Sequence, residues 1–345
     1  MIHPTAKPEE GYHQPSTVAV PSACSPLVAL APMEGVIDAL TRDLITRQGG
    51  WSFCVTEFVR ITQDKQPRRV FHRICPELRQ NALTPAGVPV HLQLLGSDPE
   101  MLAINARVAA SAGAKVVDLN FGCPAKTVNR HLGGASLLRY PEQVYAAARA
   151  VADALRPLGI PLTAKMRLGY QDTELALDNA RALQEAGISQ LVVHARTKVQ
   201  GYKPPAQWEW VARIAEVMDV PVLANGEIWT LEDYQRCVAV SGIRDVMLGR
   251  TAMTDPWLAR QIRQHHAGEA VTATEFGQVL QLLVQWLQQP AQAYQEDVRV
   301  MRTKQWLVML RLRWGEAAHQ VFDACKRCET EDELIGFLDQ AIRIL

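Results

Sequence analysis

The 345-residue sequence lacks several features that mark particular classes of protein. It carries no net charge, because 36 Lys and Arg residues balance 36 Asp and Glu residues, so nucleic-acid binding would require a local basic patch. It has no long uninterrupted apolar run, since Pro21, Pro26 and Pro32 divide the apolar stretches near the amino terminus. A signal-peptide core and a membrane span are therefore not expected. We expect a cytoplasmic protein with no membrane or DNA partner.

Cysteine usage and known motifs supply further absences. Seven cysteines, odd in number and unevenly spaced, do not form the framework of a secreted disulfide-rich domain. Cys325 and Cys328 resemble half of a zinc site, but a second Cys or His pair at a suitable spacing is missing, so no metal is expected. The sequence also lacks the G-x-G-x-x-G, Walker, H-E-x-x-H and G-x-S-x-G motifs, which removes support for a Rossmann site, a zinc protease and a hydrolase.

What the sequence does contain is a regular alternation of strand-like and helix-like segments. Eight Val- and Leu-rich runs show little alternation, which is typical of strands covered on both faces. Helical segments lie between them, with start signals such as Asp98-Pro99-Glu100 and Tyr140-Pro141-Glu142. Eight such alternations predict an α/β fold, a closed (β/α)8 TIM barrel. The predicted strands are 27–32, 53–58, 88–95, 115–120, 162–166, 191–195, 220–225 and 245–249.

Two further regions flank the predicted barrel, which we assign to residues 27–260. Residues 1–26 are expected to form a mobile leader of unknown purpose. From about Thr272 onward the sequence shows helical periods, no strand-like run and a single proline, Pro290. This texture predicts a small all-helical domain over residues 261–345.

Polar residues stand where the predicted strands end. Parallel strands bring their carboxyl ends to one rim, where barrel enzymes keep their chemistry. A single such residue is more often a hydrogen-bonded bystander, but eight strand ends with polar groups favour an enzyme. These rim residues are Pro32-Met33-Glu34, Glu57, Gln93, Asn120, Lys165, His194, Asn225 and Gly249-Arg250.

The last two strands are followed by glycine-containing loops, at 224–228 and 248–253. Loops in these positions of a barrel commonly bind a phosphate group, to which Arg250 would add a charge-assisted hydrogen bond, although the same glycines are equally compatible with ordinary turns. A phosphate beside several polar groups suits flavin mononucleotide (FMN), and Lys165 would stabilise negative charge on the reduced ring. The expected cofactor contacts are Pro32, Met33, Glu34, Gln93, Lys165, His194, Asn225, Gly226, Glu227, Gly249 and Arg250.

Six segments, in order and spacing, resemble the tRNA-dihydrouridine synthases. The resemblance covers the chain from about Leu27 to its end and implies an FMN-binding barrel followed by a helical tRNA-binding domain. It also implies that NADPH-derived electrons reduce a uridine C5=C6 bond in the tRNA D-loop. Separately from the resemblance, we expect a monomer. Segments 54–62, 71–78, 225–229 and 302–311 are most similar to the C-type branch, which implies uridine 16. The six segments are "APMEGVIDALTR" (31–42), "LNFGCPAKTV" (119–128), "KMRLG" (165–169), "HARTKVQGY" (194–202), "ANGEI" (224–228) and "VMLGR" (246–250).

Within this resemblance, Cys123 is the candidate general acid. Reduction of a uracil double bond requires a hydride for one carbon and a proton for the other. A thiol with a pKa of about 8.5 is mostly protonated at neutral pH and still acidic enough to give its proton up. Gly122 allows close backbone approach and Pro124 stiffens the loop. The alternative is an inert buried cysteine, the commonest fate of a free thiol.

The segment 298–314 contains five cations and no acidic residue, and it could meet tRNA phosphates. On a helix Arg302 and Lys304 do not share one face, so a solvated helix surface is the alternative. By resemblance, Arg302 and Lys304 are the phosphate contacts, whereas Arg60, Asn120 and Tyr202 lie where an extruded uridine would sit.

Two other functions remain open at this point. One is an FMN barrel that acts on a free pyrimidine, similar to dihydroorotate dehydrogenase, although the basic helical tail argues against it. The other is a catalytically silent tRNA-binding protein that has kept the fold. A bound flavin would argue against the second alternative, and an assay on free pyrimidines would test the first.

Overall fold

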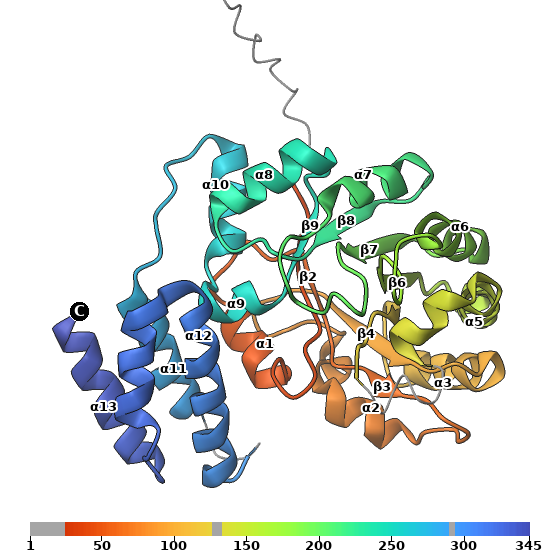
Figure 1. Cartoon of the computed structure of the whole chain (residues 1–345). Helices are drawn as coiled ribbons and strands as arrows, with labels where there is room; N and C mark the ends of the chain where they lie inside the picture. Colours follow the sequence, from red (N-terminus) through yellow and green to blue (C-terminus); the bar gives the residue numbers. More distant parts are fainter. Residues whose placement is uncertain (1–24, 126–132, 290–293) are drawn as a thin grey trace, which may run out of the picture.

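The computed structural model describes residues 25–125, 133–289 and 294–345. Residues 1–24 of the predicted leader lie outside these ranges, as do residues 126–132 of the segment that follows Cys123. Figure 1 shows a barrel of strands surrounded by helices, with the carboxy-terminal helices packed beside it.

Eight parallel strands close into a barrel. β1 pairs with both β2 and β9, and β2 pairs with β4, so the ring of strands has no free edge. Each strand begins and ends within three residues of the bounds of a predicted run, and the predicted TIM barrel is confirmed. The strands are β1 (Val28–Leu30), β2 (Phe53–Val55), β4 (Val90–Leu95), β5 (Val117–Phe121), β6 (Leu162–Arg167), β7 (Gln190–His194), β8 (Val222–Asn225) and β9 (Val246–Leu248).

The predicted second strand, 53–58, is wrong in its second half. β2 ends at Val55, and the chain pairs with β4 again only as β3 (Val59–Arg60). At the break, the backbone N–H of Gln93 donates to the Thr56 hydroxyl at 3.1 Å instead of to a backbone carbonyl. The Glu57 carboxylate accepts a hydrogen bond from the backbone N–H of Gly35 in the loop after β1. The interruption therefore places polar side chains of this segment at the rim.

Helices connect the strands on the outside of the barrel (Figure 1). α3 begins at the predicted Pro99, and the Asp98 carboxylate accepts a hydrogen bond from the backbone N–H of Met101 at 3.0 Å. α5 begins at the predicted Pro141. The helices of this layer are α1 (Ala39–Thr46), α2 (Arg68–Ile74), α3 (Pro99–Ser111), α5 (Pro141–Leu155), α6 (Ala176–Ala186), α7 (Trp208–Glu216), α8 (Leu231–Ser241) and the short α9 (Arg250–Thr254), with 3-10 turns at Pro76–Gln80, Gly134–Arg139 and Arg156–Leu158.

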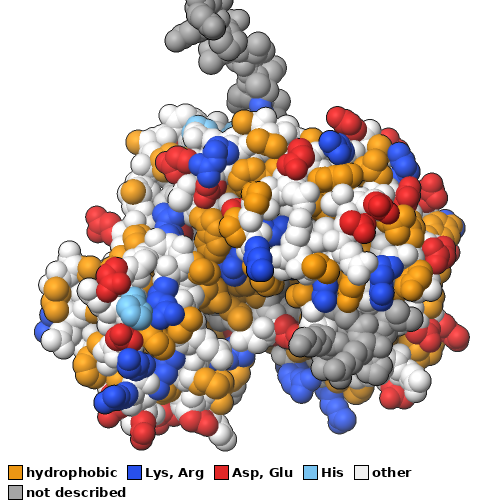
Figure 2. Space-filling view, in the orientation of Figure 1, with side chains coloured by type: hydrophobic (Ala, Val, Ile, Leu, Met, Phe, Trp, Pro, Cys, Tyr) orange, Lys and Arg blue, Asp and Glu red, His pale blue; other side chains and the backbone are white. Residues whose placement is uncertain are grey.

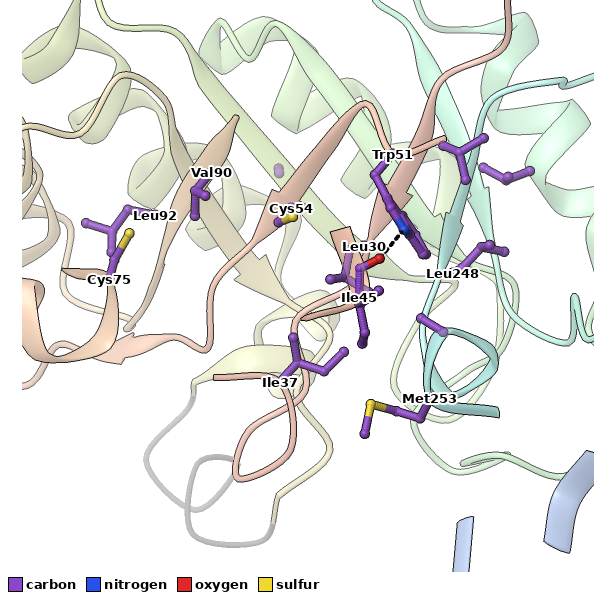
Figure 3. Packing of buried hydrophobic residues seen from close by; sticks show 14 of the residues in the cluster. Leu30, Ile37, Ile45, Trp51, Cys54, Cys75, Val90, Leu92, Leu248 and Met253 are labelled. Atoms are coloured by element: carbon purple, nitrogen blue, oxygen red, sulfur yellow. Dashed lines mark hydrogen bonds between the residues drawn. The ribbon is translucent and has the colours of Figure 1, made fainter. Parts of the chain in front are cut away.

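Apolar side chains fill the space between strands and helices. In Figure 3, Leu30, Ile37 and Leu248 lie in this layer together with Trp51, whose indole N–H donates to the backbone carbonyl of Ile45 at 3.1 Å. A second apolar cluster joins strands β1, β2, β7, β8 and β9, and its buried members are Ala29, Ala31, Phe53, Val55, Val192, Leu223 and Met247. This packing fixes the strands, and hence the residues at their ends, in position.

After α9 the described residues form α10 (Leu258–Ala267), α11 (Phe276–Leu287), α12 (Glu296–Cys325) and α13 (Glu331–Ile344). α10 lies against α8, where the hydroxyl of Tyr234 and Nε2 of His266 are 2.6 Å apart. The predicted domain boundary after residue 260 falls inside α10. α11, α12 and α13 pack together beside the barrel (Figure 1). Among the described residues, no helix is long and apolar enough to cross a membrane.

α12 joins the helical region to the rim of the barrel. The indole N–H groups of Trp306 and Trp314 donate to backbone carbonyls of α9 at 2.6 and 2.8 Å. The Arg313 guanidinium forms an ion pair with the buried Asp255 at 2.9 Å. These contacts hold the helical region next to the carboxyl ends of the strands.

Candidate active site

Two adjoining cavities lie at the carboxyl ends of the strands. The first, of about 570 Å³, is lined mainly by the ends of β6 to β9. The second, of about 1360 Å³, is lined by the ends of β4 to β6, by Phe58 and by Met309 of α12. Figure 2 shows the surface hollowed between the helical region and the barrel, with Lys and Arg side chains beside the hollow. The two cavities share Pro32, Met33, Lys165, Tyr202 and Arg250.

The structure brings together all the residues that the sequence indicates as cofactor contacts. The first cavity contains Pro32, Met33, Lys165, His194, Asn225, Gly226, Glu227, Gly249 and Arg250. The second adds Glu34, Gln93, Asn120 and Cys123. Strand ends far apart in sequence therefore form one continuous mouth, in which polar side chains stand among apolar ones.

The loop after β8 has little room for a side chain beside His194. Gly226 has a φ of +115°, and a Cβ at this position would lie 3.0 Å from Cδ2 of His194. A glycine is therefore required both by the backbone conformation and by the close approach. Beside it lies Arg196, which the sequence analysis missed although it stands two residues after His194.

Arg196 is buried, with 1% of its surface exposed, yet its guanidinium is only partly satisfied. Its Nε donates to the backbone carbonyl of Lys203 at 2.8 Å, and its Nη2 pairs with the Glu227 carboxylate. Its Nη1 has no hydrogen-bond partner among the described residues. A buried N–H group without a partner beside a glycine loop fits an anionic ligand such as a phosphate.

Arg250 is held between two aromatic rings at the edge of the first cavity. Its guanidinium carbon lies 4.5 Å from the ring centre of Tyr202 and 5.0 Å from that of Trp229. Cation–π contacts of this kind orient the guanidinium. The aromatic partners were not visible in the sequence as a pair, because 27 positions separate them.

Lys165 and His194 form the floor of the mouth. The Lys165 ammonium donates to Oδ1 of Asn225 at 3.0 Å, and the Asn225 amide donates to the backbone carbonyl of Met247 at 2.7 Å. Burial, with the nearby positive charge of Arg167, lowers the pKa of Lys165 to about 7. Burial also holds the pKa of His194 well below its usual range, so its ring is neutral.

Cys123 lies on the wall of the second cavity with 9% of its surface exposed. Its backbone N–H and that of Gly122 donate to Oδ1 of Asn120 at 2.8 and 2.9 Å. Burial raises the pKa of the Cys123 thiol, so the sulfur carries its proton at neutral pH. Arg167, a second residue missed by the sequence analysis, donates to the backbone carbonyl of Gly122 at 2.9 Å and thereby holds the loop from the other side.

The residues predicted to contact the extruded uridine lie at different places around the mouth. Asn120 and Tyr202 line the second cavity, and Tyr202 is 52% exposed. Arg60 is exposed at the end of β3. Arg302 and Lys304 do not line either cavity.

The cations of segment 298–314 have different partners within the protein. Arg302 pairs with the Asp38 carboxylate, which also accepts a hydrogen bond from the Tyr294 hydroxyl at 2.6 Å. Lys304 donates to the backbone carbonyl of Cys328. Two further cations of the segment also form ion pairs, Arg299 with Glu331 and Arg313 with Asp255. The segment thus contributes to the packing of the helical region as well as to its charge.

The Cys325 and Cys328 side chains are both buried. Among the residues that the structure describes, no group of three or more His, Cys, Asp or Glu side chains could hold a metal ion.

A closed parallel barrel with its polar residues gathered at one mouth places the chain among the TIM-barrel enzymes. Two solved structures share this fold: a 2-naphthoyl-CoA reductase (TM-score 0.52, 12% identity, 70% of this chain and 50% of that chain) and histamine dehydrogenase from Rhizobium sp. 4-9 (TM-score 0.51, 15% identity, 70% and 46%).

Sequence comparison defines the family. The profile of dihydrouridine synthase (Dus) matches residues 29–342, and the chain belongs to this family. It is 50% identical to the tRNA-dihydrouridine(16) synthase of Aquipseudomonas alcaligenes, over 90% of this chain and 98% of that protein. It is 50% identical to the protein of that name in Pseudomonas syringae pv. tomato (90% and 97%) and 48% identical to that of Ralstonia nicotianae (91% and 95%). The resemblance found in the sequence is confirmed.

Proposed function

We propose that this protein is a tRNA-dihydrouridine synthase that reduces the C5=C6 bond of uridine 16 in the tRNA D-loop, with FMN as cofactor and NADPH as electron donor. Family membership and the activity in the names of its relatives support the reaction and its position. The observation that carries the proposal is the placement of a protonated thiol, Cys123, on the wall of a cavity that adjoins the glycine-lined one.

The residues of the first cavity suit FMN. The backbone of Gly226 and Gly249, together with Arg250, would hold its phosphate, and the positive charge of Arg196 lies directly behind Gly226. Lys165, with Gln93 and His194, would contact the ring system. When bound, reduced FMN supplies the hydride for one carbon of the uracil ring.

Cys123 supplies the proton for the other carbon. The S–H bond breaks as the new C–H bond forms, and the sulfur is left as a thiolate that water reprotonates. Desolvation keeps the thiol protonated until then, while the positive charges of Arg167 and Arg60 favour the thiolate that forms. Pairing a raised resting pKa with nearby cations suits an acid that must hold its proton and then release it.

The target base must leave the tRNA stack to reach this cavity. We propose that Tyr202, Asn120 and Arg60 receive the extruded uridine and that the helical region, residues 261–345, binds the body of the tRNA beside the barrel of residues 27–260. Arg302 and Lys304 remain proposed phosphate contacts, and each would share or exchange its present partner on binding. A monomeric state and a cytoplasmic location stay predictions.

The purified protein should carry a flavin absorption spectrum. Incubation with NADPH and tRNA that lacks dihydrouridine should convert uridine 16, as mapped by sequencing after chemical treatment specific for dihydrouridine. Free uridine and dihydroorotate should not react. Turnover of a free pyrimidine without turnover of tRNA would instead establish the dihydroorotate dehydrogenase-like function, and tRNA binding without reduction would establish a silent binding protein.

A further inference from the structure

A buried carboxylate lies beneath the mouth of the barrel, and no step proposed above uses it. Asp118 is 1% exposed and belongs to β5, two residues before Asn120. Its two carboxylate oxygens accept hydrogen bonds from the Thr163 hydroxyl at 2.6 Å and from the Gln93 amide at 2.7 Å. Asp118 does not line either cavity.

The charge of Asp118 fixes the orientation of two amide side chains. A carboxylate can only accept hydrogen bonds, so Gln93 must turn its Nε2 toward Asp118 and its Oε1 toward Asn120. The Nδ2 of Asn120 then donates to this Oε1 at 2.7 Å. That leaves the Oδ1 of Asn120 to accept the backbone N–H groups of Gly122 and Cys123.

We infer that Asp118 is a positioning residue for Cys123, acting through Gln93 and Asn120. The inference rests on the proposed function in that Cys123 is taken as the proton donor. We call the hydrogen-bonded series Asp118–Gln93–Asn120 the relay. Each hydrogen bond in it decides which end of the next amide donates and which accepts, so a change of charge at Asp118 alters the loop that carries the thiol. Sequence separation does not weaken the relay, because β4 and β5 are neighbouring strands.

The carboxylate is ionised under the conditions in which it would act. Burial raises the pKa of Asp118 to about 6, and the hydrogen bonds from Thr163 and Gln93 and the positive charge of Lys165 oppose this rise. Near neutral pH the acceptor-only form therefore predominates.

Asp118→Asn should reverse the relay while keeping its shape. The Thr163 hydroxyl would still donate to Oδ1 of the new amide, whose Nδ2 would then face Gln93. Gln93 must then accept this hydrogen bond with Oε1, so its Nε2 turns toward Asn120. Asn120 in turn presents Oδ1 to Gln93, and its Nδ2 faces the backbone N–H groups of Gly122 and Cys123. Two donors cannot bond each other, so these two N–H groups lose their acceptor.

The direct test is amide hydrogen exchange of residues 119–125, measured by mass spectrometry in the flavin-loaded protein. Asp118→Asn should speed exchange at Gly122 and Cys123 by on the order of tenfold, because one hydrogen-bonded acceptor is lost. The double variant Asp118→Asn with Gln93→Glu moves the carboxylate one step along the relay and should restore slow exchange. Thr163→Val is the matched control, because it removes the other hydrogen bond of Asp118 and leaves the relay intact.

Faster exchange that the double variant fails to restore would overturn the inference, as would unchanged exchange in Asp118→Asn. Faster amide exchange in β6 would identify general unfolding, because a local reversal of the relay leaves the amides of that strand protected. Unfolding in every Asp118 variant would show a structural role only and would also overturn the inference.

Activity separates this inference from the proposed function. Asp118→Asn should lower kcat for tRNA by at least about tenfold, since the loop that carries the proton donor is disturbed. KM for tRNA should rise by a smaller factor, because the Asn120 amide is reversed while Tyr202 and Arg60 keep their positions. If Cys123→Ala reduced tRNA normally, the proposed acid would be wrong even where the exchange pattern supports the relay. Normal kcat in Asp118→Asn, with Cys123→Ala inactive, would reject the positioning role alone.

Discussion

Replacement of Gly226 by alanine should weaken FMN binding without unfolding the protein. The residue has a φ of +115°, and the added Cβ would lie 3.0 and 3.3 Å from two atoms of the His194 ring. Backbone strain of this kind costs about 1–3 kcal/mol. If the loop relieves this strain by moving in the free protein, FMN binding must restore the strained conformation, and the affinity for FMN falls by about 5- to 150-fold. Titration of the apo-protein with FMN, followed by the quenching of flavin fluorescence, measures this loss.

Gly242→Ala provides the matched control for Gly226→Ala. Gly242 also has a positive φ, +70°, but it ends α8, and a Cβ there would meet no atom within 4 Å. We expect this variant to lose about 1 kcal/mol of folding stability, as for alanine at other left-handed positions, and to bind FMN normally. Equal FMN affinity in the two variants would contradict the assignment of the Gly226 loop to the cofactor.

Three further outcomes are expected. His91 is stacked on Phe53, and burial lowers its pKa to about 4, so unfolding takes up a proton and the free energy of unfolding falls as the pH drops from about 6.5 to about 4. Between about pH 7 and about pH 5, His91→Phe should therefore lose about 2 kcal/mol less of its free energy of unfolding than the wild type does, as measured by urea unfolding. An equal loss in the two proteins would contradict this cause. Asp38→Ala removes the carboxylate that pairs with Arg302, accepts a hydrogen bond from Tyr294 and caps α1, and it should lower the free energy of unfolding by about 2 kcal/mol. Asp153→Ala, in an exposed ion pair, should leave the urea midpoint unchanged. Equal midpoints in the two variants would show that the contacts of Asp38 contribute nothing. Raising the salt concentration from about 50 to about 200 mM should weaken tRNA binding steeply in a filter-binding assay, and a flat response would argue against phosphate contacts.

The strands and the rim residues could be predicted because both depend on local pattern. A strand covered on both faces must be apolar along its length, and the residue at its carboxyl end is free to be polar. Lys165 and Asn225 illustrate this: each ends or nearly ends an apolar run, and the structure brings their side chains to 3.0 Å. Closure of the barrel then places all such ends at one mouth.

The residues that sequence analysis missed depend on long-range pairing. Asp118 lies inside an apolar run, and only its contacts with Gln93 and Thr163, on two other strands, give it a role. The resemblance predicts Arg302 as a phosphate contact, but the sequence does not reveal its ion pair with Asp38, 264 positions earlier. A local sequence pattern shows a charged residue but not the distant residues that pair with it. The partners of these charges therefore could not be predicted.

The proton-donor role of Cys123 is tested most directly by rapid mixing of the pre-reduced protein with tRNA, which follows oxidation of the bound flavin. Cys123→Ala should bind FMN and accept electrons from NADPH at the wild-type rate, because neither step uses the thiol. Its oxidation by tRNA should be slower by about 10²- to 10⁴-fold, the range associated with loss of a general acid. Oxidation by tRNA at the wild-type rate, with dihydrouridine formed, would contradict the account.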